Sequence, residues 1–252
     1  MFEHLRSFKP ELSKRNAAET GIRYEWYALQ RWGSEYWREF SDAKVFVPAI
    51  EDEANYAPDF SGFFGNDKTS FFIPPSVPFA LAVTNSPISW WITRQTFPSK
   101  QGGFYEFKPM YISALPIPIA DSSQQSLCER LAEALICLHR PSPKSARDSD
   151  TNLIIGYFEQ WLNGLIYELF FRDELHARKL KLFDETAKLN PPKLAKLSEV
   201  DKMAHLRELF ERAYDPSAAL RGSLFDLRSL ESVRIIEEET GENPSSAINE
   251  VE

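Results

Sequence analysis

Two acidic residues and a lysine in this sequence match, in their order, the residues with which many nucleases hold magnesium. Asp59 follows Pro58, and Glu106-Phe107-Lys108 comes much later in the chain. In such a site the carboxylates bind the metal, and the lysine stabilises the charge that develops on the cleaved phosphate. Short acid-x-lysine triplets also arise by chance, and the interval here is long. The alternative is a turn aspartate and a surface pair that share no chemistry.

A second candidate is the tetrapeptide Asn190-Pro191-Pro192-Lys193. Amino-methyltransferases use an acidic or amide residue, two prolines and an aromatic residue to grip a flipped-out base, and the ring supplies the stacking. Lysine replaces the ring here, and no glycine-rich loop accompanies it, so we interpret the segment as a linker between helices. The four histidines and two cysteines lack the spacing of metal ligands. We therefore expect no catalytic residue, metal or cofactor in this chain.

Residues 23–32 form the stretch richest in nucleic-acid chemistry, because they combine aromatic residues with arginines and a glutamine. Arginine and glutamine side chains hydrogen-bond guanine and adenine edges in a bidentate manner. The same residues also suit a packed aromatic corner with arginine stems lying over it. The residues alone leave both interpretations open.

The composition limits the class of protein but does not indicate what it binds. The 252 residues are 43% hydrophobic and 13% aromatic, which is typical of an ordered globular protein. The formal net charge is −8, and the residues from Glu231 onward contribute −6 of it. The remainder is near neutral and could present a basic face. Two stray cysteines, no signal pattern and no long apolar run predict a cytoplasmic protein without membrane contact.

The elements that must position these residues change character at Met110–Ile119. This run is apolar and uncharged, and its alternating prolines predict an edge strand or an extended strap. Aromatic, strand-like sequence with turns precedes it. The elements that we predict there are a strand at 44–50, a hairpin at 58–67 with its return strand at 69–73, helices at 79–82 and 89–94, and a strand at 104–107.

The sequence after this run is almost entirely helical in pattern. We predict helices at 121–139, 150–171, 194–214 and 223–238, with a linker at 141–150. The expected fold class is α+β, in which a mixed α/β domain with a curved sheet precedes a helical bundle. The expected domains are the mixed α/β domain at residues 1–120 and the helical scaffold at 121–240. Residues 241–252 are expected to form a disordered acidic tail.

Several motifs occur together in a characteristic order. They are Phe8–Arg15, Trp26-Tyr27-Ala28-Leu29, Lys44–Pro48, Asp59 with Gly62, Leu81–Ser86, Leu115–Pro118 and, in the helical part, Ile166–Asp184. In this order the sequence resembles the TaqI-like C-terminal specificity domain. That domain is the target-recognition part of type IIG and related restriction–modification enzymes and of phage-defence adenine methyltransferases.

The resemblance implies a chain that reads a short DNA sequence and positions a separate catalytic domain over the target adenine. Residue type and expected loop position then nominate contacts of two kinds. The phosphate contacts would be Lys44, Lys68, Arg94 and Lys100. The base-edge contacts would be Arg23, Gln30, Arg31 and Gln101, with Tyr24 and Tyr105 as packing or stacking partners. The alternative for any one of these residues is a solvated surface role.

The resemblance also bears on cofactors and partners. Methyltransferase and nuclease parts normally precede this domain and are missing here, so we expect a split-gene subunit, a fragment or a remnant. S-adenosylmethionine, and magnesium if a nuclease exists, are expected only in that catalytic part. The expected partners are double-stranded DNA and a methyltransferase or endonuclease domain.

Three functions remain open at this point. The first is a DNA-recognition module with no catalysis of its own. The second is a magnesium-dependent nuclease built on Asp59, Glu106 and Lys108. The third is a protein-interaction module whose helices bind a partner methyltransferase, and it is compatible with the first.

Overall fold

The computed structural model describes residues 2–14, 25–27, 36–140 and 149–240, and the chain forms two compact units, Met1–Asp42 and Ala43–Glu252. The smaller unit contains α1 (Phe2–Arg6), α2 (Lys9–Leu12) and the 3-10 helix η1 (Trp37–Ser41). Phe2 lies 5.6 Å from Trp26 and 5.2 Å from Tyr27 between ring centroids. These two motif residues therefore pack within an aromatic cluster of their own unit.

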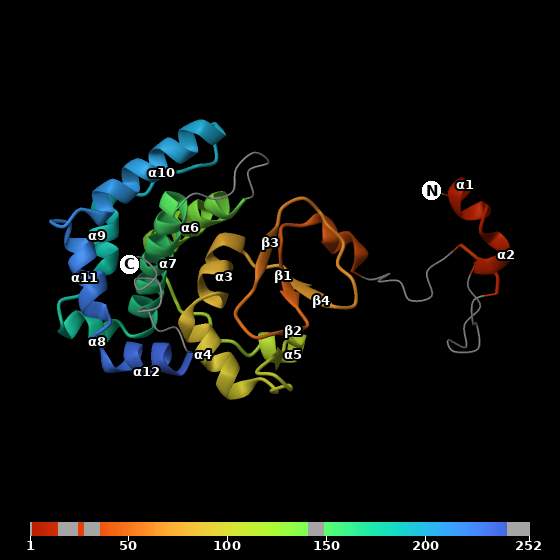
Figure 1. Ribbon diagram of the computed structural model, residues 1–252, viewed down its shortest axis with the longest axis horizontal. Helices are drawn as coiled ribbons and strands as arrows, with labels where there is room; N and C mark the ends of the chain where they lie inside the picture. Colours follow the sequence, from red (N-terminus) through yellow and green to blue (C-terminus); the bar gives the residue numbers. More distant parts are fainter. Residues whose placement is uncertain (1, 15–24, 28–35, 141–148, 241–252) are drawn as a thin grey trace. The chain divides into compact units, whose positions relative to one another are not determined.

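The larger unit begins with a sheet of three described strands, in the order β3-β1-β4 (Figure 1). The strands are β1 (Lys44–Pro48), β3 (Ala57–Asp59) and β4 (Thr69–Phe72). Both outer strands are antiparallel to β1, with Lys44 opposite Asp59 and Val45 opposite Phe72. Val45 and Val47 are fully buried. Since side chains alternate along a strand, Lys44 and Phe46 belong to the opposite face.

The hairpin predicted at 58–67 is wrong, because β1 lies between the two strands that it was to join. β3 and β4 are both antiparallel to β1, so they run parallel to one another. Residues 60–68 therefore return along the length of β1, as any connection between parallel strands must. The glycines that suggested a tight hairpin turn belong to this crossover loop.

Two short helices, α3 (Val77–Thr84) and α4 (Pro87–Thr96), confirm the pair predicted at 79–82 and 89–94. Each begins after a serine whose hydroxyl accepts a backbone N–H three residues on, and each has proline in its first turn. β5 (Tyr105–Glu106), which pairs with β2 (Ile50–Glu51), confirms the strand predicted at 104–107, whereas the strand predicted at 44–50 divides into β1 and β2.

The run Met110–Ile119 is only partly extended. The short helix α5 (Pro109–Ile112) occupies its first residues, which corrects the expected edge strand, and no regular structure follows before Asp121. Pro109 at the start of α5 supplies a backbone φ suited to a first helical turn. Leu115 is buried in the smaller core cluster and ties the extended part to the sheet.

Helices account for the rest of the described chain. They are α6 (Ser122–His139), α7 (Ser149–Phe170), α8 (Arg172–Ala177), α9 (Leu182–Leu189), α10 (Glu199–Tyr214), α11 (Ala219–Leu227) and α12 (Glu231–Thr240). Asp121 and Gln124 form a capping box that starts α6 where the sequence predicts it. The single helix predicted at 223–238 is wrong, because the chain turns between α11 and α12. The turn allows Leu227, Leu230 and Val233 all to be buried.

The boundary expected at residue 120 falls inside the larger unit. Val83 of α3 and Ile88 of α4 belong to the same core cluster as Trp161 of α7 and Val233 of α12. In Figure 1, α3 and α4 lie between the sheet and the helices α6–α12. The fold is α+β, and within the described residues the strands are confined to 44–106 while helices predominate elsewhere. None of the helices in the described segments is long and apolar enough to cross a membrane.

Candidate nucleic-acid interface

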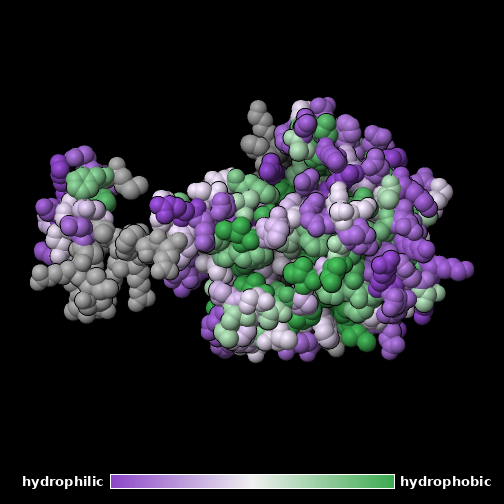
Figure 2. Space-filling model, turned by 180° about the vertical axis from the view of Figure 1, so that it is seen from behind, coloured by the Kyte–Doolittle hydropathy of each residue, from purple (hydrophilic) through white to green (hydrophobic). Residues whose placement is uncertain are grey.

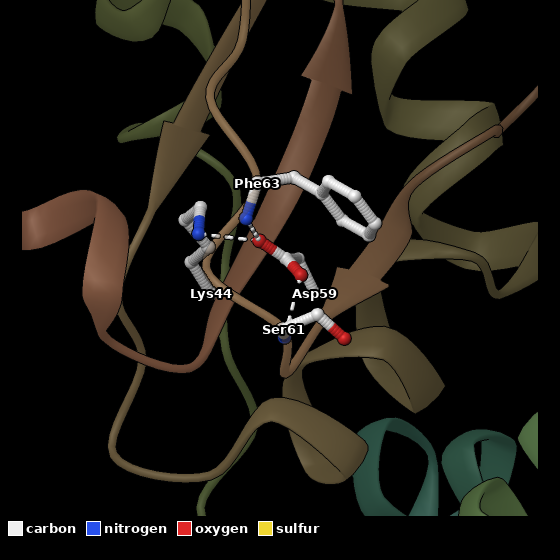
Figure 3. Close-up of polar contacts among 4 residues, drawn as sticks. All are labelled: Lys44, Asp59, Ser61 and Phe63. Atoms are coloured by element: carbon white, nitrogen blue, oxygen red, sulfur yellow. Dashed lines mark hydrogen bonds and ion pairs between the residues drawn. The ribbon is translucent and has the colours of Figure 1, made fainter.

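A buried ion pair anchors the crossover loop 60–68 to the sheet. Lys44 Nζ lies 2.5 Å from Asp59 Oδ2, and the two side chains are 0% and 3% exposed. The Asp59 carboxylate also accepts hydrogen bonds from the backbone N–H groups of Ser61 and Phe63, each at 2.8 Å. Figure 3 shows the carboxylate at the centre of these three contacts, with the Phe63 ring directed away from it.

This environment lowers the pKa of Asp59. Burial raises the pKa of the carboxyl group, but the hydrogen bonds from Lys44, Ser61 and Phe63 and the adjacent ammonium charge lower it further than burial raises it. The net pKa lies below the ordinary value, so the group is a carboxylate at neutral pH. A charged, fully engaged carboxylate fixes the first residues of the loop.

The loop presents phenylalanine rings to solvent from this fixed base. Phe60, Phe63 and Phe64 are 53%, 68% and 70% exposed. Gly62 adopts a φ of 76°, which side chains disfavour. Gly65 lies so close to the sheet that a Cβ atom there would be 2.9 Å from the Phe46 ring. The loop is therefore pinned at both ends while its rings stay accessible.

Phe60 and Phe63 line one wall of a cleft of about 1040 Å³. Residues of α3, α6, α7, α11 and α12 line the rest, so the cleft lies between the crossover loop and the helical part of the larger unit. Leu81, Ala82 and Leu162 are buried residues at its surface. The site is concave and partly apolar, which is typical of ligand sites.

Two arginines bring positive charge to this cleft. Arg140 follows the last residue of α6, and Arg228 follows the last residue of α11. Neither guanidinium group has a hydrogen-bond or ion-pair partner among the residues that the structure describes. The arginines can therefore bind an anion such as phosphate without first breaking an ion pair.

Amide side chains of α7 complete the polar lining. Gln160 is exposed and Asn163 half-buried, and within the described ranges neither amide forms a hydrogen bond. The cleft also holds three carboxylates: Asp59 is paired with Lys44, Glu159 lies 3.2 Å from His139 Nε2, and Glu237 accepts a 3.4 Å hydrogen bond from Tyr167. Aromatic rings, guanidinium groups and unengaged amides together can stack on a base, bind a phosphate and pair with base edges.

The residues that sequence reasoning nominated for DNA contact fall into several situations. Arg23, Tyr24, Gln30 and Arg31 lie outside the described residues. Lys68 is exposed in the crossover loop, 3.2 Å from Asp67. Arg94 is half-buried near the end of α4. None of the nominated residues lines the cleft.

The assignment of Lys44 as a phosphate contact needs correction. Its ammonium group is buried and paired with Asp59, so a phosphate on the surface cannot reach it. A lysine at the start of a strand is usually solvated, and residue type alone gave no sign that Asp59 would lie opposite. The role of Lys44 here is to hold the loop.

Lys100, Gln101 and Tyr105 do lie together, in and beside one turn. Ser99 pairs with Tyr105 as an isolated bridge, and Gly102 and Gly103 both adopt a φ of 85° between them. Lys100 forms a 3.1 Å ion pair with Glu106, and the Tyr105 ring packs 5.4 Å from Trp90. Tyr105 is thus a packing residue, whereas Lys100 and Gln101 are exposed.

The proposed nuclease residues belong to separate sets of contacts. Asp59 pairs with Lys44 in one sheet, whereas Glu106 pairs with Lys100 and Lys108 beside the other. Hydrogen bonds from these two lysines lower the pKa of Glu106. No group of three or more histidine, cysteine or acidic residues suited to a metal occurs in the described part of the chain. The geometry gives the nuclease hypothesis no support.

The interpretation of Asn190–Lys193 as a linker is confirmed, because the tetrapeptide lies between α9 and α10. Asn190 takes a left-handed conformation with a φ of 48°, and its side chain accepts a hydrogen bond from Arg130. The segment therefore ends one helix and attaches to another.

Sequence reasoning missed the cleft itself. Arg140 and Arg228 each follow a helix, a position that favours cations, but nothing local indicates that the residues after α6 and α11 line the same cleft. The phenylalanines of the loop had a clearer signal, since residues 60–64 contain three of them beside one glycine. No protein-family model matches the chain, and a search of curated proteins found no match.

Proposed function

We propose that this chain is a nucleic-acid-binding module that has no catalytic activity of its own. The observation that carries the proposal is the cleft, because its lining combines two exposed phenylalanines with two arginines and two amides that have no ion-pair or hydrogen-bond partner among the described residues. Guanidinium groups bind phosphates, amides pair with base edges and aromatic rings stack on bases. Each component of nucleotide recognition is thus represented in one site.

The particular function that we propose is DNA target recognition within a restriction–modification or phage-defence system. The ordered motifs that resemble the TaqI-like specificity domain support this choice over RNA binding. In this proposal the chain acts in the cytoplasm and positions a separate adenine methyltransferase or endonuclease. That partner would hold S-adenosylmethionine, and magnesium where it cleaves DNA.

Binding to duplex DNA at low salt tests the proposal. The double variant Arg140→Gln/Arg228→Gln should weaken binding and reduce the slope of log K against log salt by about 2, since each phosphate contact contributes about 0.9. The matched control is Arg207→Gln/Arg212→Gln on the exposed surface of α10, which makes the same charge change outside the cleft. Equal losses in both variants, or no binding by the unmodified protein, would reject the proposal.

Sequence specificity requires its own measurement. Selection from a randomised duplex pool should enrich a short motif if the chain reads bases. Changing Gln30, Arg31 or Gln101 should then alter the motif, while Lys100→Gln should weaken all sequences alike because a phosphate contact carries no sequence information. A bound but unenriched pool would refute sequence reading by this chain alone.

A second candidate function, docking of the partner methyltransferase, is favoured by a separate apolar groove of about 590 Å³. Val47, Phe72, Phe79, Leu115 and Ile117 are among the residues that line it. Ile117 and Ile119 are 56% and 96% exposed. Figure 2 shows hydrophobic residues gathered in patches on one face of the larger unit. Exposed apolar patches are typical of protein interfaces.

The docking hypothesis calls for variants at these isoleucines. The leucines at 223–238 are unsuitable for this test, because they are buried in the core and their replacement would destabilise the fold. Ile117→Asp, at a residue that lines the groove, should abolish co-purification with a methyltransferase, whereas Phe225→Asp, at a 74% exposed residue of α11, should not. Retained co-purification of Ile117→Asp would exclude this surface.

A further inference from the structure

We infer that the cleft holds a single unstacked nucleotide of the bound nucleic acid, with its base against the Phe63 ring. The inference rests on the proposed function and names the ligand of the same site. The cleft volume of about 1040 Å³ is at the upper end of small-molecule sites. A paired and stacked base cannot enter such a concavity, whereas an extruded or single-stranded nucleotide can.

The Phe63 ring is held in a position suited to stacking before a ligand binds. Phe63 is 68% exposed, yet its backbone N–H is bonded to a buried carboxylate that a buried lysine in turn holds. Exposed phenylalanine rings on a flexible loop would tend to fold back on the protein to escape water. Fixing the backbone at Asp59 keeps the ring at the cleft wall, where a base can cover its face.

The other groups of the cleft divide between the phosphate and the base edge. Arg140 and Arg228 carry the positive charge and so take the phosphates. Gln160 and Asn163 each present a donor and an acceptor, which suits the mixed pattern of a base edge. Each carboxylate of the cleft has a partner of its own: Asp59 is paired with Lys44, Glu159 with His139 and Glu237 with Tyr167.

Three duplexes of identical flanking sequence test the inference with the full chain. The first is fully paired, the second carries one bulged, unpaired nucleotide, and the third carries an abasic residue at the bulge. We expect the bulged duplex to bind about tenfold more tightly than the paired one, because stacking of one base on an aromatic ring supplies that order of affinity. The abasic bulge has the same backbone flexibility and should lose the preference.

Phe63→Ala should abolish the preference for the bulged duplex and leave binding to the paired duplex within about twofold, since stacking contributes only with an unpaired base. The matched control is Phe225→Ala, which removes an equally exposed ring on α11 outside the cleft and should leave the preference intact.

The outcomes separate the inference from the proposed function. Equal binding of paired and bulged duplexes, or a preference that persists for the abasic bulge or in Phe63→Ala, would overturn the inference while DNA binding stands. Absence of binding to every duplex would reject the proposed function, and with it the inference.

Discussion

Lys44 and Asp59 stabilise the fold only as a pair, because each charge is buried with the other as its neutralising partner. Removing one partner of a buried pair leaves an uncompensated charge, which costs about 3–5 kcal/mol. Lys44→Met and Asp59→Asn should each lower the free energy of unfolding by this amount. The double variant should cost less than the sum, with a coupling energy of about 0.5–3 kcal/mol in urea unfolding.

The surface pair Arg234–Glu238 provides the control for this cycle. Its side chains are 62% and 68% exposed and lie 3.2 Å apart. Replacing both residues, as Arg234→Met/Glu238→Gln, should change the free energy of unfolding by no more than about 1 kcal/mol. A coupling energy no larger than that of the surface pair would show that Lys44 and Asp59 do not act together.

The stability contributed by Asp59 should depend on pH in a defined direction. Its pKa in the folded protein is lower than its ordinary value of 3.8, so the unfolded chain binds its proton first as pH falls. The contribution is therefore complete above about pH 5 and declines as pH falls through and below about 4. In urea titrations, the stability gap between the unmodified protein and Asp59→Asn should narrow from pH 6 to pH 3, by this linkage. A constant gap would contradict the lowered pKa.

For single residues, the residue type predicted the role of Asp59 and Gly62 in a loop but did not predict where the Lys44 side chain would lie. Asp59 and Gly62 were singled out as a turn, and both do shape a loop. Lys44 was assigned to DNA because lysines at strand ends usually meet solvent. Its burial follows from pairing with a residue fifteen positions away, and strand register between non-adjacent segments is not encoded in local sequence.

At the scale of single elements, the crossover loop depends on the absence of a side chain at Gly65. A Cβ atom there would lie 2.5 Å from Thr69 Oγ1 and 2.9 Å from the Phe46 ring. Gly65→Ala should therefore lower the free energy of unfolding by about 1–3 kcal/mol through overpacking. Because the displaced loop carries Phe63, the variant should also weaken binding to the bulged duplex.

Gly222→Ala is the control for this change. Gly222 lies within α11, and no atom outside its own helix backbone comes within 4 Å of a Cβ atom built there. Alanine should therefore stabilise the protein by about 0.5–1 kcal/mol through helix propensity. Urea unfolding of both variants compares Gly65, which is crowded, with Gly222, which is not. Equal changes in the free energy of unfolding would mean that loop 60–68 can shift to accommodate a Cβ atom at little cost.

The elements that could be predicted were those with local signals. Asp121, Ser76 and Ser86 cap helices because their side chains bond to backbone groups two or three residues away. The crossover of 60–68 could not be predicted in this way, since it depends on β1 inserting between β3 and β4. The break between α11 and α12 likewise reflects burial against α4 and α7 and has no glycine or proline at the turn.

For the whole molecule, packing continues across the division expected at residue 120, because residues on both sides of it share one core cluster. Residues 1–120 alone would leave faces of α3 and α4 exposed, because α6 and α7 pack on α3 and α12 packs on α4 from the far end of the sequence. Contacts of this range carry no local signature. The result matters for the site, because the cleft exists only where the crossover loop and the helices belong to one body.

The charge of the whole chain leads to the last prediction. Residues 241–252 contain three glutamates and no lysine or arginine, so deleting them changes the formal net charge from −8 to −5. Less repulsion from DNA should raise the association rate at low salt by about two- to threefold, with little effect at high salt where charges are screened. The full-length variant Glu242→Gln/Glu250→Gln/Glu252→Gln should reproduce the gain in stopped-flow binding. A gain on deletion alone would assign the effect to the length of the segment, and no gain in either protein would mean that these three charges do not govern association.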